Sequence, residues 1–211
     1  MDHLVSVITP THDPRYLFES YLSLVGQTHP HWEWILVPNQ GAVIPDQIAS
    51  DPRVHVHPFS GSSGIGELKR FGFNQASGIL LVELDHDDLL APNCLAALCG
   101  AAQLAEPGFY YSDFVRFAHD ENGFRTTPVY DPTFGFSSYP CVISGQSALA
   151  TRAFPPEAQA MLRIGSAPNH VRAWSKVLYD RLGGHDATLS VCDDFDLVCR
   201  TYASGAPFTH I

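Results

Sequence analysis

The order of apolar and polar positions along the first half of the chain is typical of strands that alternate with helices. Short runs rich in Val, Ile and Leu predict buried strands at 5–9, 34–37, 54–57 and 79–84. Between them, apolar residues recur at helical spacing over 16–25 and from about 67 to 76. This alternation predicts an α/β fold, with a mostly parallel sheet and crossover helices.

The second half is less regular and contains more turn residues. Its patterns predict helices over 92–104, 174–182 and 194–203, and strands within 108–117, over 145–150 and from 208 onwards. The segment Asp120–Gly123 is typical of a turn. No internal repeat or linker separates the two halves, so we expect one domain over 1–211, divided into a half over 1–104 and a half over 105–211.

The fourth predicted strand stops abruptly in a group of carboxylates, Asp85, Asp87 and Asp88, with His86 between the first two. Carboxylates this close together repel one another, and a shared cation such as Mg²⁺ or Mn²⁺ relieves that repulsion. Ligands of parallel α/β sheets bind beyond the carboxyl ends of the strands, which is where Asp85 is expected. The alternative is a solvated acidic turn that caps the following helix.

Composition narrows the possible partners. Lys and Arg number 12 against 22 Asp and Glu, which gives a formal net charge of −10, so we expect no nucleic-acid partner. The 5 cysteines form no Cys-x-x-Cys pair and are typical of reduced, mostly buried thiols. No apolar run approaches about 18 residues, the length that a membrane-spanning helix needs.

Five motifs, in order along nearly the whole chain, resemble the family-2 glycosyltransferases with the GT-A fold, a Rossmann-like, mixed and mostly parallel sheet flanked by helices. The motifs are Val5–His12, Leu22–Thr28 with Trp32–Val37, Asn74–Gly78 with Leu84–Asp88, Leu182–Asp186, and Asp193–Leu197. The resemblance implies an inverting, metal-dependent enzyme that moves a sugar from a nucleotide-diphosphate donor to an acceptor hydroxyl.

The resemblance also implies roles for the donor side. Asp87 would bind Mn²⁺ or Mg²⁺ directly, and Asp85 would face the metal through water or the donor ribose. Further donor contacts are implied at Pro10, Thr11, His12, Asn39, Lys69, Arg70 and His86. Relatives often carry Asp where this chain has Asn39. An amide that donates and accepts suits uracil or another base, so this departure leaves the base open, with a UDP-sugar as the first candidate. For Lys69 and Arg70 the alternative is a solvated helix face, and for Asp88 an acceptor role in the turn.

The base is expected in the second acidic group. The family pattern Glu-Asp appears here as Asp193-Asp194, and the resemblance implies that Asp194 removes the acceptor proton, with Asp193 beside it. The alternative is that these carboxylates only favour a helix N-terminus. A late histidine completes the metal shell in some relatives, and His210 is the candidate for that position.

The acceptor is left open as a glycan, a lipid-linked sugar or a protein. Relatives that build cell-surface glycans imply a cytoplasmic location, at the inner membrane face, and the chain end at Ile211 suggests a further domain or membrane association outside this chain. The rival class is a non-catalytic nucleotide-binding or scaffold domain that retains the fold. A sugar nucleotidyltransferase would instead open with a Gly-rich loop after the first strand, which Thr9–His12 does not provide.

Overall fold

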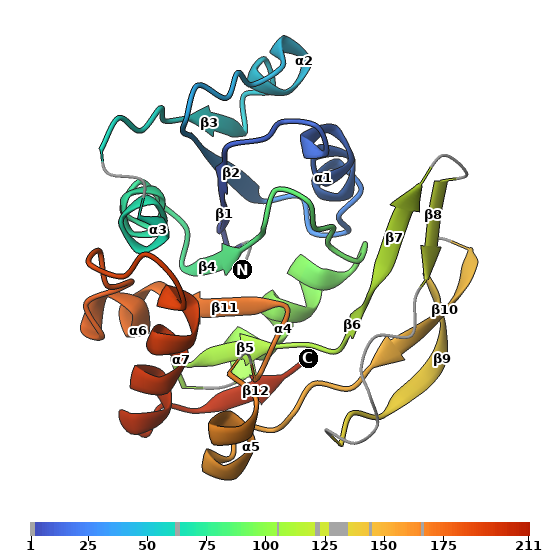
Figure 1. Cartoon of the computed structure of the whole chain (residues 1–211), viewed down its shortest axis with the longest axis vertical. Coiled ribbons are helices and arrows are strands. Elements are labelled where there is room, and N and C mark those ends of the chain that lie inside the picture. The colour runs from blue at the N-terminus through green and yellow to red at the C-terminus, as the bar shows by residue number, and fades with distance from the viewer. Residues whose placement is uncertain are drawn as a thin grey trace.

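A seven-stranded sheet runs through the centre of the computed structural model, which describes residues 3–61, 64–104, 106–120, 123–126, 135–143, 145–165 and 167–211 (Figure 1). The strand order is β12-β5-β11-β4-β1-β2-β3. β11 runs antiparallel to its neighbours β4 and β5, and the other pairings are parallel. The strands are β1 (Val5–Thr11), β2 (Trp32–Pro38), β3 (Val54–Val56), β4 (Leu80–Glu83), β5 (Phe109–Tyr111), β11 (Arg172–Ser175) and β12 (Phe208–His210).

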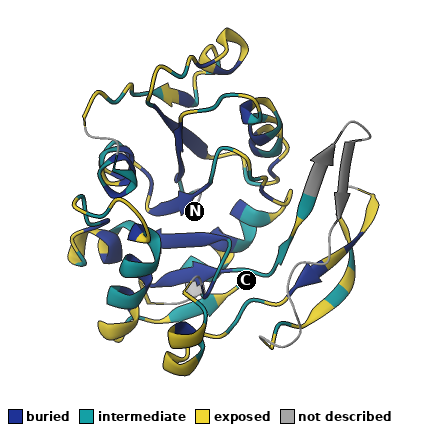
Figure 2. Ribbon diagram, viewed as in Figure 1, coloured by how far each residue is buried: buried dark blue, intermediate teal, exposed yellow. Residues whose placement is uncertain are grey.

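Helices cover both faces of this sheet (Figure 1). α1 (Leu17–Val25) and α4 (Cys94–Leu104) contribute to the hydrophobic core on one face, together with Val5 and Val7 of β1. α3 (Ile65–Asn74), α5 (Ala158–Arg163), α6 (Lys176–Arg181) and α7 (Asp193–Ala203) contribute to the core on the other face, together with Ile8. The central strands are therefore buried on both sides, as Figure 2 shows.

Smaller elements extend the second half. β6 (Phe114–Val115), β10 (Gln146–Thr151) and β9 (Ser138–Ile143) form a three-stranded antiparallel sheet, and β7 (Phe117–Asp120) pairs with β8 (Gly123–Thr126). α2 (Asp46–Ala49) lies between β2 and β3 in the chain. In Figure 1 the two hairpins stand to one side of the large sheet.

The predicted fold class is confirmed, because the sheet is mixed, mostly parallel and flanked by helices. The division into halves over 1–104 and 105–211 stays a prediction, and the large sheet takes strands from both ranges. The predicted turn at Asp120–Gly123 falls partly on residues 121 and 122, outside the described residues. All five cysteines are free, but only Cys99 is buried, while Cys94, Cys141 and Cys199 are half-buried and Cys192 is exposed, so the expectation of mostly buried thiols is wrong.

The prediction of a helix over 174–182 is wrong at its start. Trp174 belongs to strand β11, where it is fully buried and pairs with Leu81 and Phe109. Its apolar character reflects burial in the sheet, and the helical spacing to Leu178 is fortuitous. The helix begins only after Ser175, whose hydroxyl accepts a hydrogen bond from the Leu178 amide as an N-cap.

Candidate active site

A cavity of about 250 Å³ lies at the carboxyl ends of three strands of the large sheet. Parallel strands end at the same edge of a sheet, so the loops that follow them converge there. The backbone amide of Asn39 donates to the carbonyl of Thr11 (2.9 Å) and joins the loops after β1 and β2. The lining residues are Pro10, Thr11, His12, Asn39, Ile65, Leu68, Asp85, His86 and Asp87.

Two histidines flank this cavity. The rings of His12 and His86 lie edge to face, with centroids 5.0 Å apart and an interplanar angle of 89°. Because His12 follows β1 and His86 follows β4, the contact holds two loops together at the rim of the cavity. Seven residues that the sequence predicted for donor or metal binding line this one cavity: Pro10, Thr11, His12, Asn39, Asp85, His86 and Asp87.

The carboxylates of Asp85 and Asp87 have chemistry that suits a divalent cation. Asp87 is exposed and Asp85 is half-buried. Both residues belong to the lining of the cavity. No group of three or more His, Cys, Asp or Glu among the described residues could hold a metal by itself. Mg²⁺ is often held by one or two carboxylates together with substrate phosphates, and this donor set fits that pattern.

Asp88 does not belong to the lining of the cavity and contacts other parts of the chain. Its carboxylate lies 3.6 Å from Nδ1 of His170, and its backbone carbonyl accepts a hydrogen bond from the Ser20 hydroxyl (2.9 Å). Burial raises the pKa of Asp88, and the neighbouring charges of Asp85 and Asp87 raise it further. The backbone amide of Asp88 donates to the carbonyl of Asp85, which closes the turn after β4.

A buried cluster of charges lies directly behind this turn, centred on Glu83, the last residue of β4. Lys69 of α3 forms an ion pair with Glu83 Oε1, and Arg172 of β11 donates through Nε to Glu83 Oε2 at 2.9 Å. All three residues are almost completely buried. Burial alone would raise the pKa of Glu83, but the charges of Arg172 and Lys69 outweigh it and hold that pKa well below its usual value.

Each cation of this cluster also reaches one of the two carboxylates that begin α7. Lys69 Nζ lies 3.8 Å from Asp193 Oδ2, and Arg172 Nη2 lies 2.9 Å from Asp194 Oδ2. Burial lowers the pKa of Lys69 and of Arg172, but carboxylates outweigh this effect and raise both pKa values. Asp85, which lines the cavity, is among the carboxylates that raise these pKa values.

Asp193 and Asp194 have different surroundings although they are adjacent. The Asp193 side chain is 3% exposed and lies 2.9 Å from Nδ1 of His185, a fully buried ring among aromatic side chains. The Asp194 side chain is 25% exposed, so one carboxylate faces solvent while the other is enclosed. Only the more exposed of the two is open to a substrate.

The remaining predicted residues lie elsewhere. Arg70 is exposed, and its Nη1 donates to the carbonyl of His185 at 3.3 Å. His210 Nε2 lies 2.7 Å from Asp113 Oδ1, and Asp113 also accepts from the Tyr139 hydroxyl and the Ala153 amide. Neither Arg70 nor His210 belongs to the lining of the cavity, and Lys69 does not either.

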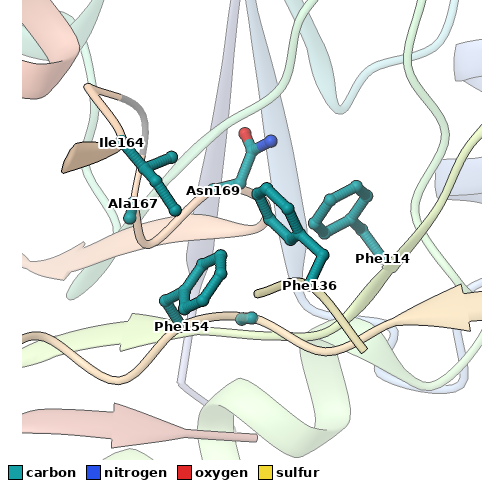
Figure 3. A pocket seen from close by; sticks show the side chains of 7 residues that line it. Phe114, Phe136, Phe154, Ile164, Ala167 and Asn169 are labelled. Atoms are coloured by element: carbon teal, nitrogen blue, oxygen red, sulfur yellow. The ribbon is translucent and has the colours of Figure 1, made fainter. Parts of the chain in front are cut away.

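A group of apolar side chains from the range 105–211 packs together and leaves no open pocket between them. The side chains of Phe114, Phe136, Phe154 and Ile164 lie together beside Ala167 and Asn169 (Figure 3), and the space between them holds no water-sized volume. The rings of Phe136 and Phe154 meet edge to face at 4.5 Å. This cluster packs the small sheet against the segment after α5 and offers no room for a ligand.

Two residues of the site were missed by sequence reasoning, Glu83 and Arg172. Glu83 carried a detectable signal, because a single carboxylate inside an apolar strand must find a buried partner. Arg172 carried none, since it lies before the predicted helix over 174–182 and its pairing with Glu83 depends on the antiparallel register of β11 with β4.

Comparisons with known proteins show the family of this chain. Residues 6–163 match the family described as Glycosyl transferase family 2, and the chain belongs to this family. TuaG of Bacillus subtilis (strain 168), named as a candidate glycosyltransferase of teichuronic acid biosynthesis, is 27% identical over 131 residues, which cover 53% of this chain and 52% of TuaG. Glycosyltransferase GlyG of Streptococcus pneumoniae serotype 4 is 25% identical over 130 residues, 59% of this chain and 43% of GlyG.

Solved structures show the same fold at low identity. The crystal structure of S. aureus TarS 1-349 in complex with UDP has a TM-score of 0.69 and 15% identity, over 98% of this chain and 57% of that chain. The mannosyltransferase PcManGT from Pyrobaculum calidifontis, in complex with GDP-Man and Mn²⁺, has a TM-score of 0.59 and 16% identity, over 98% of this chain and 54% of that chain. The chain thus spans about half the length of TuaG and of these two structures. None of the described helices has the length and apolar character that crossing a membrane requires.

Proposed function

We propose that this chain is the donor-binding and catalytic domain of a glycosyltransferase that moves a sugar from a nucleoside-diphosphate donor to an acceptor hydroxyl. The observation that carries the proposal is the cavity beyond β1, β2 and β4, which has the carboxylates of Asp85 and Asp87 in its lining. Family membership supports the same reaction class. The structure of TarS with UDP-GlcNAc supports a nucleotide sugar as the donor.

Asp87 is proposed to hold Mn²⁺ or Mg²⁺ directly, with Asp85 beside it, because both carboxylates line the cavity. When bound, such a cation supplies electrostatic stabilisation of the charge that develops on the departing diphosphate. His210 is a weaker part of the proposed metal shell, since its Nε2 already contacts Asp113.

The nucleotide is proposed to lie against Pro10, Thr11 and His12 on one side and Asn39 on the other. UDP is the first candidate, because TarS was solved with UDP. GDP is the second, because PcManGT was solved with GDP-Man. The carboxamide of Asn39 both donates and accepts, so it suits either base.

Asp194 is proposed as the general base. As the acceptor oxygen forms its bond to the anomeric carbon, the bond from that carbon to the diphosphate oxygen breaks. The hydroxyl proton passes to the Asp194 carboxylate, and the diphosphate leaves on the opposite side. A single displacement of this kind inverts the anomeric configuration. The 3% exposed side chain of Asp193 supports a part in holding α7 and not in meeting the acceptor.

The acceptor is proposed to be a glycan, a lipid-linked sugar or a protein, and the place of action to be the cytoplasm at the inner membrane face. The relation to TuaG, named for teichuronic acid biosynthesis, supports the glycan among these acceptors.

A panel of nucleotide sugars tests this function. The release of nucleoside diphosphate is measured for each donor with Mn²⁺, with Mg²⁺ and with a chelator, first with water as the acceptor and then with candidate glycans. We expect release from one nucleotide class, and its loss with the chelator. Nucleotide binding without turnover of any donor would favour a non-catalytic domain that retains the fold.

A further inference from the structure

The buried cluster joins the two functional parts of the site through its cations. Glu83 lies two positions before Asp85, so its place in β4 determines where the metal-binding turn begins. Asp194 lies in the first turn of α7, far away in the chain. Arg172 is the residue that contacts both Glu83 and Asp194 directly, at 2.9 Å in each case.

The register of the sheet places Arg172 in this position. Arg172 pairs directly with Glu83 across the antiparallel β11–β4 pair, so their side chains emerge on the same face. From there the guanidinium donates through Nε to one oxygen of Glu83, and its Nη2 reaches Asp194. A planar fork with donors on several nitrogens can make both contacts at once.

Burying so many charges is costly, and apolar residues of similar volume would often stabilise such a core equally well. The cluster is therefore poorly explained by stability alone. A role in geometry accounts for it better, because the buried Arg172–Glu83 pair continues into the Arg172–Asp194 pair, and the two contacts limit how far α7 can move relative to the end of β4.

We propose that Arg172 is a positioning residue for Asp194: it fixes the orientation of the base relative to the cavity that holds Asp85 and Asp87. This inference rests on the proposed function, since it concerns the geometry of that reaction. Arg172 does not line the donor cavity, so its loss should lower kcat and leave the KM for the donor nearly unchanged.

The test is a double-mutant cycle on Arg172→Lys and Asp194→Asn. Arg172→Lys keeps the charge but replaces the rigid planar fork, with donors on several nitrogens, by one ammonium group on a flexible stem, so the fixed geometry of the two contacts is lost. We expect its kcat to fall by about 10- to 100-fold, the range typical of residues that orient a functional group, with the donor KM within about twofold. If Arg172 acts through Asp194, the double variant loses no more activity than Asp194→Asn alone.

Two further variants make the result interpretable. Arg172→Met fills similar space without the charge and is assayed if Arg172→Lys fails to fold, as judged by thermal unfolding. Arg200→Lys is the matched control. Arg200 lies on α7, pairs with Asp196 on the same helix and donates to the carbonyls of Leu182 and Gly184, and we expect the kcat of this variant to stay within about twofold of wild type.

Each outcome separates this inference from the proposed function. Wild-type kcat in Arg172→Lys, or a double variant whose losses multiply independently, overturns the positioning role while Asp194 remains the base. Full activity in Asp194→Asn overturns the proposed base itself.

Discussion

Arg172 Nη2 lies 2.9 Å from Asp194 Oδ2, in a contact that joins the strand next to β4 with the first turn of α7. The same guanidinium is hydrogen-bonded to Glu83, two residues before the acidic turn at the cavity. The proposed metal ligands and the proposed base are thus tied to one buried cluster and not only to surface loops. Buried, densely packed charges of this kind move less than loops do, so we expect the proposed catalytic geometry to be largely preformed.

Replacing Asp87 by Asn should weaken nucleotide binding only when metal is present. The amide removes the charge that a divalent cation requires, while the rest of the cavity wall is unchanged. We expect the affinity for UDP in Mn²⁺ to fall by at least about tenfold, and the affinity in chelator to stay the same. Calorimetric titration measures both. Asp180→Asn, an exposed carboxylate on α6, is the control and should bind as wild type does.

Asn39→Asp should change which base is preferred. A carboxylate only accepts hydrogen bonds, so a base edge that presents an N–H gains and an edge that presents a carbonyl loses. We expect the ratio of UDP to GDP dissociation constants to move by about tenfold, the effect of one buried hydrogen bond. Gln40→Glu is the control, because Gln40 is exposed and does not line the cavity. Equal ratios in Asn39→Asp and wild type would remove Asn39 from the base site.

Gly66→Ala should destabilise the wall of the cavity. A Cβ at Gly66 would lie 2.1 Å from the carbonyl oxygen of Asp186 and 2.9 Å from that of Leu189, and both are backbone atoms that cannot turn away. We expect a lower Tm and weaker donor binding, since α3 carries the lining residues Ile65 and Leu68.

The matched control is Gly100→Ala in α4, where an added Cβ meets no atom within 4 Å. Helix propensity alone should then stabilise the protein by about 0.5–1 kcal/mol. The opposite signs of the two substitutions distinguish close packing from propensity, and destabilisation of both by the same amount would contradict this account.

Acid should weaken the cluster around Glu83. The folded-state pKa of Glu83 lies below its usual value of 4.5, so its contribution to stability is present above that value and is lost as the pH falls through the folded pKa. Below the usual value, wild type should lose about 1.4 kcal/mol per pH unit more than Glu83→Gln, which has no proton to gain. Urea unfolding between pH 7 and pH 3 measures the two slopes, and parallel slopes would show that Glu83 is not stabilised as a charge.

The sequence predicted most of the donor half because that half is built from local signals. The apolar runs of β1, β2 and β4 end in polar residues, and parallel strand ends converge, so the pattern alone places Asp85 and Asn39 at one edge of the sheet. The apolar runs and the polar residues that end them are local features, so they can be recognised in the sequence.

The second half was harder because its key contacts depend on tertiary register. Trp174 fits a helical period and a buried strand equally well, and only its pairing with Leu81 decides between them. Lys69 followed a helix pattern that indicated a donor contact or a solvated face, whereas it lies enclosed against Glu83. Ion pairs between residues far apart in the sequence produce no periodic pattern, so they cannot be predicted from the spacing of residues.

The central claim, transfer with Asp194 as the base, is tested most directly by comparing Asp194→Asn with Asp196→Asn on the same turn of α7. Asp196 pairs with Arg200 and serves as a neighbouring carboxylate of equal charge. The measurement is kcat for release of nucleoside diphosphate from the preferred donor, with donor affinity determined in parallel. The account predicts a loss of about 10²- to 10⁴-fold for Asp194→Asn with unchanged affinity, and a change of less than about threefold for Asp196→Asn. Equal activity of the two variants would contradict it.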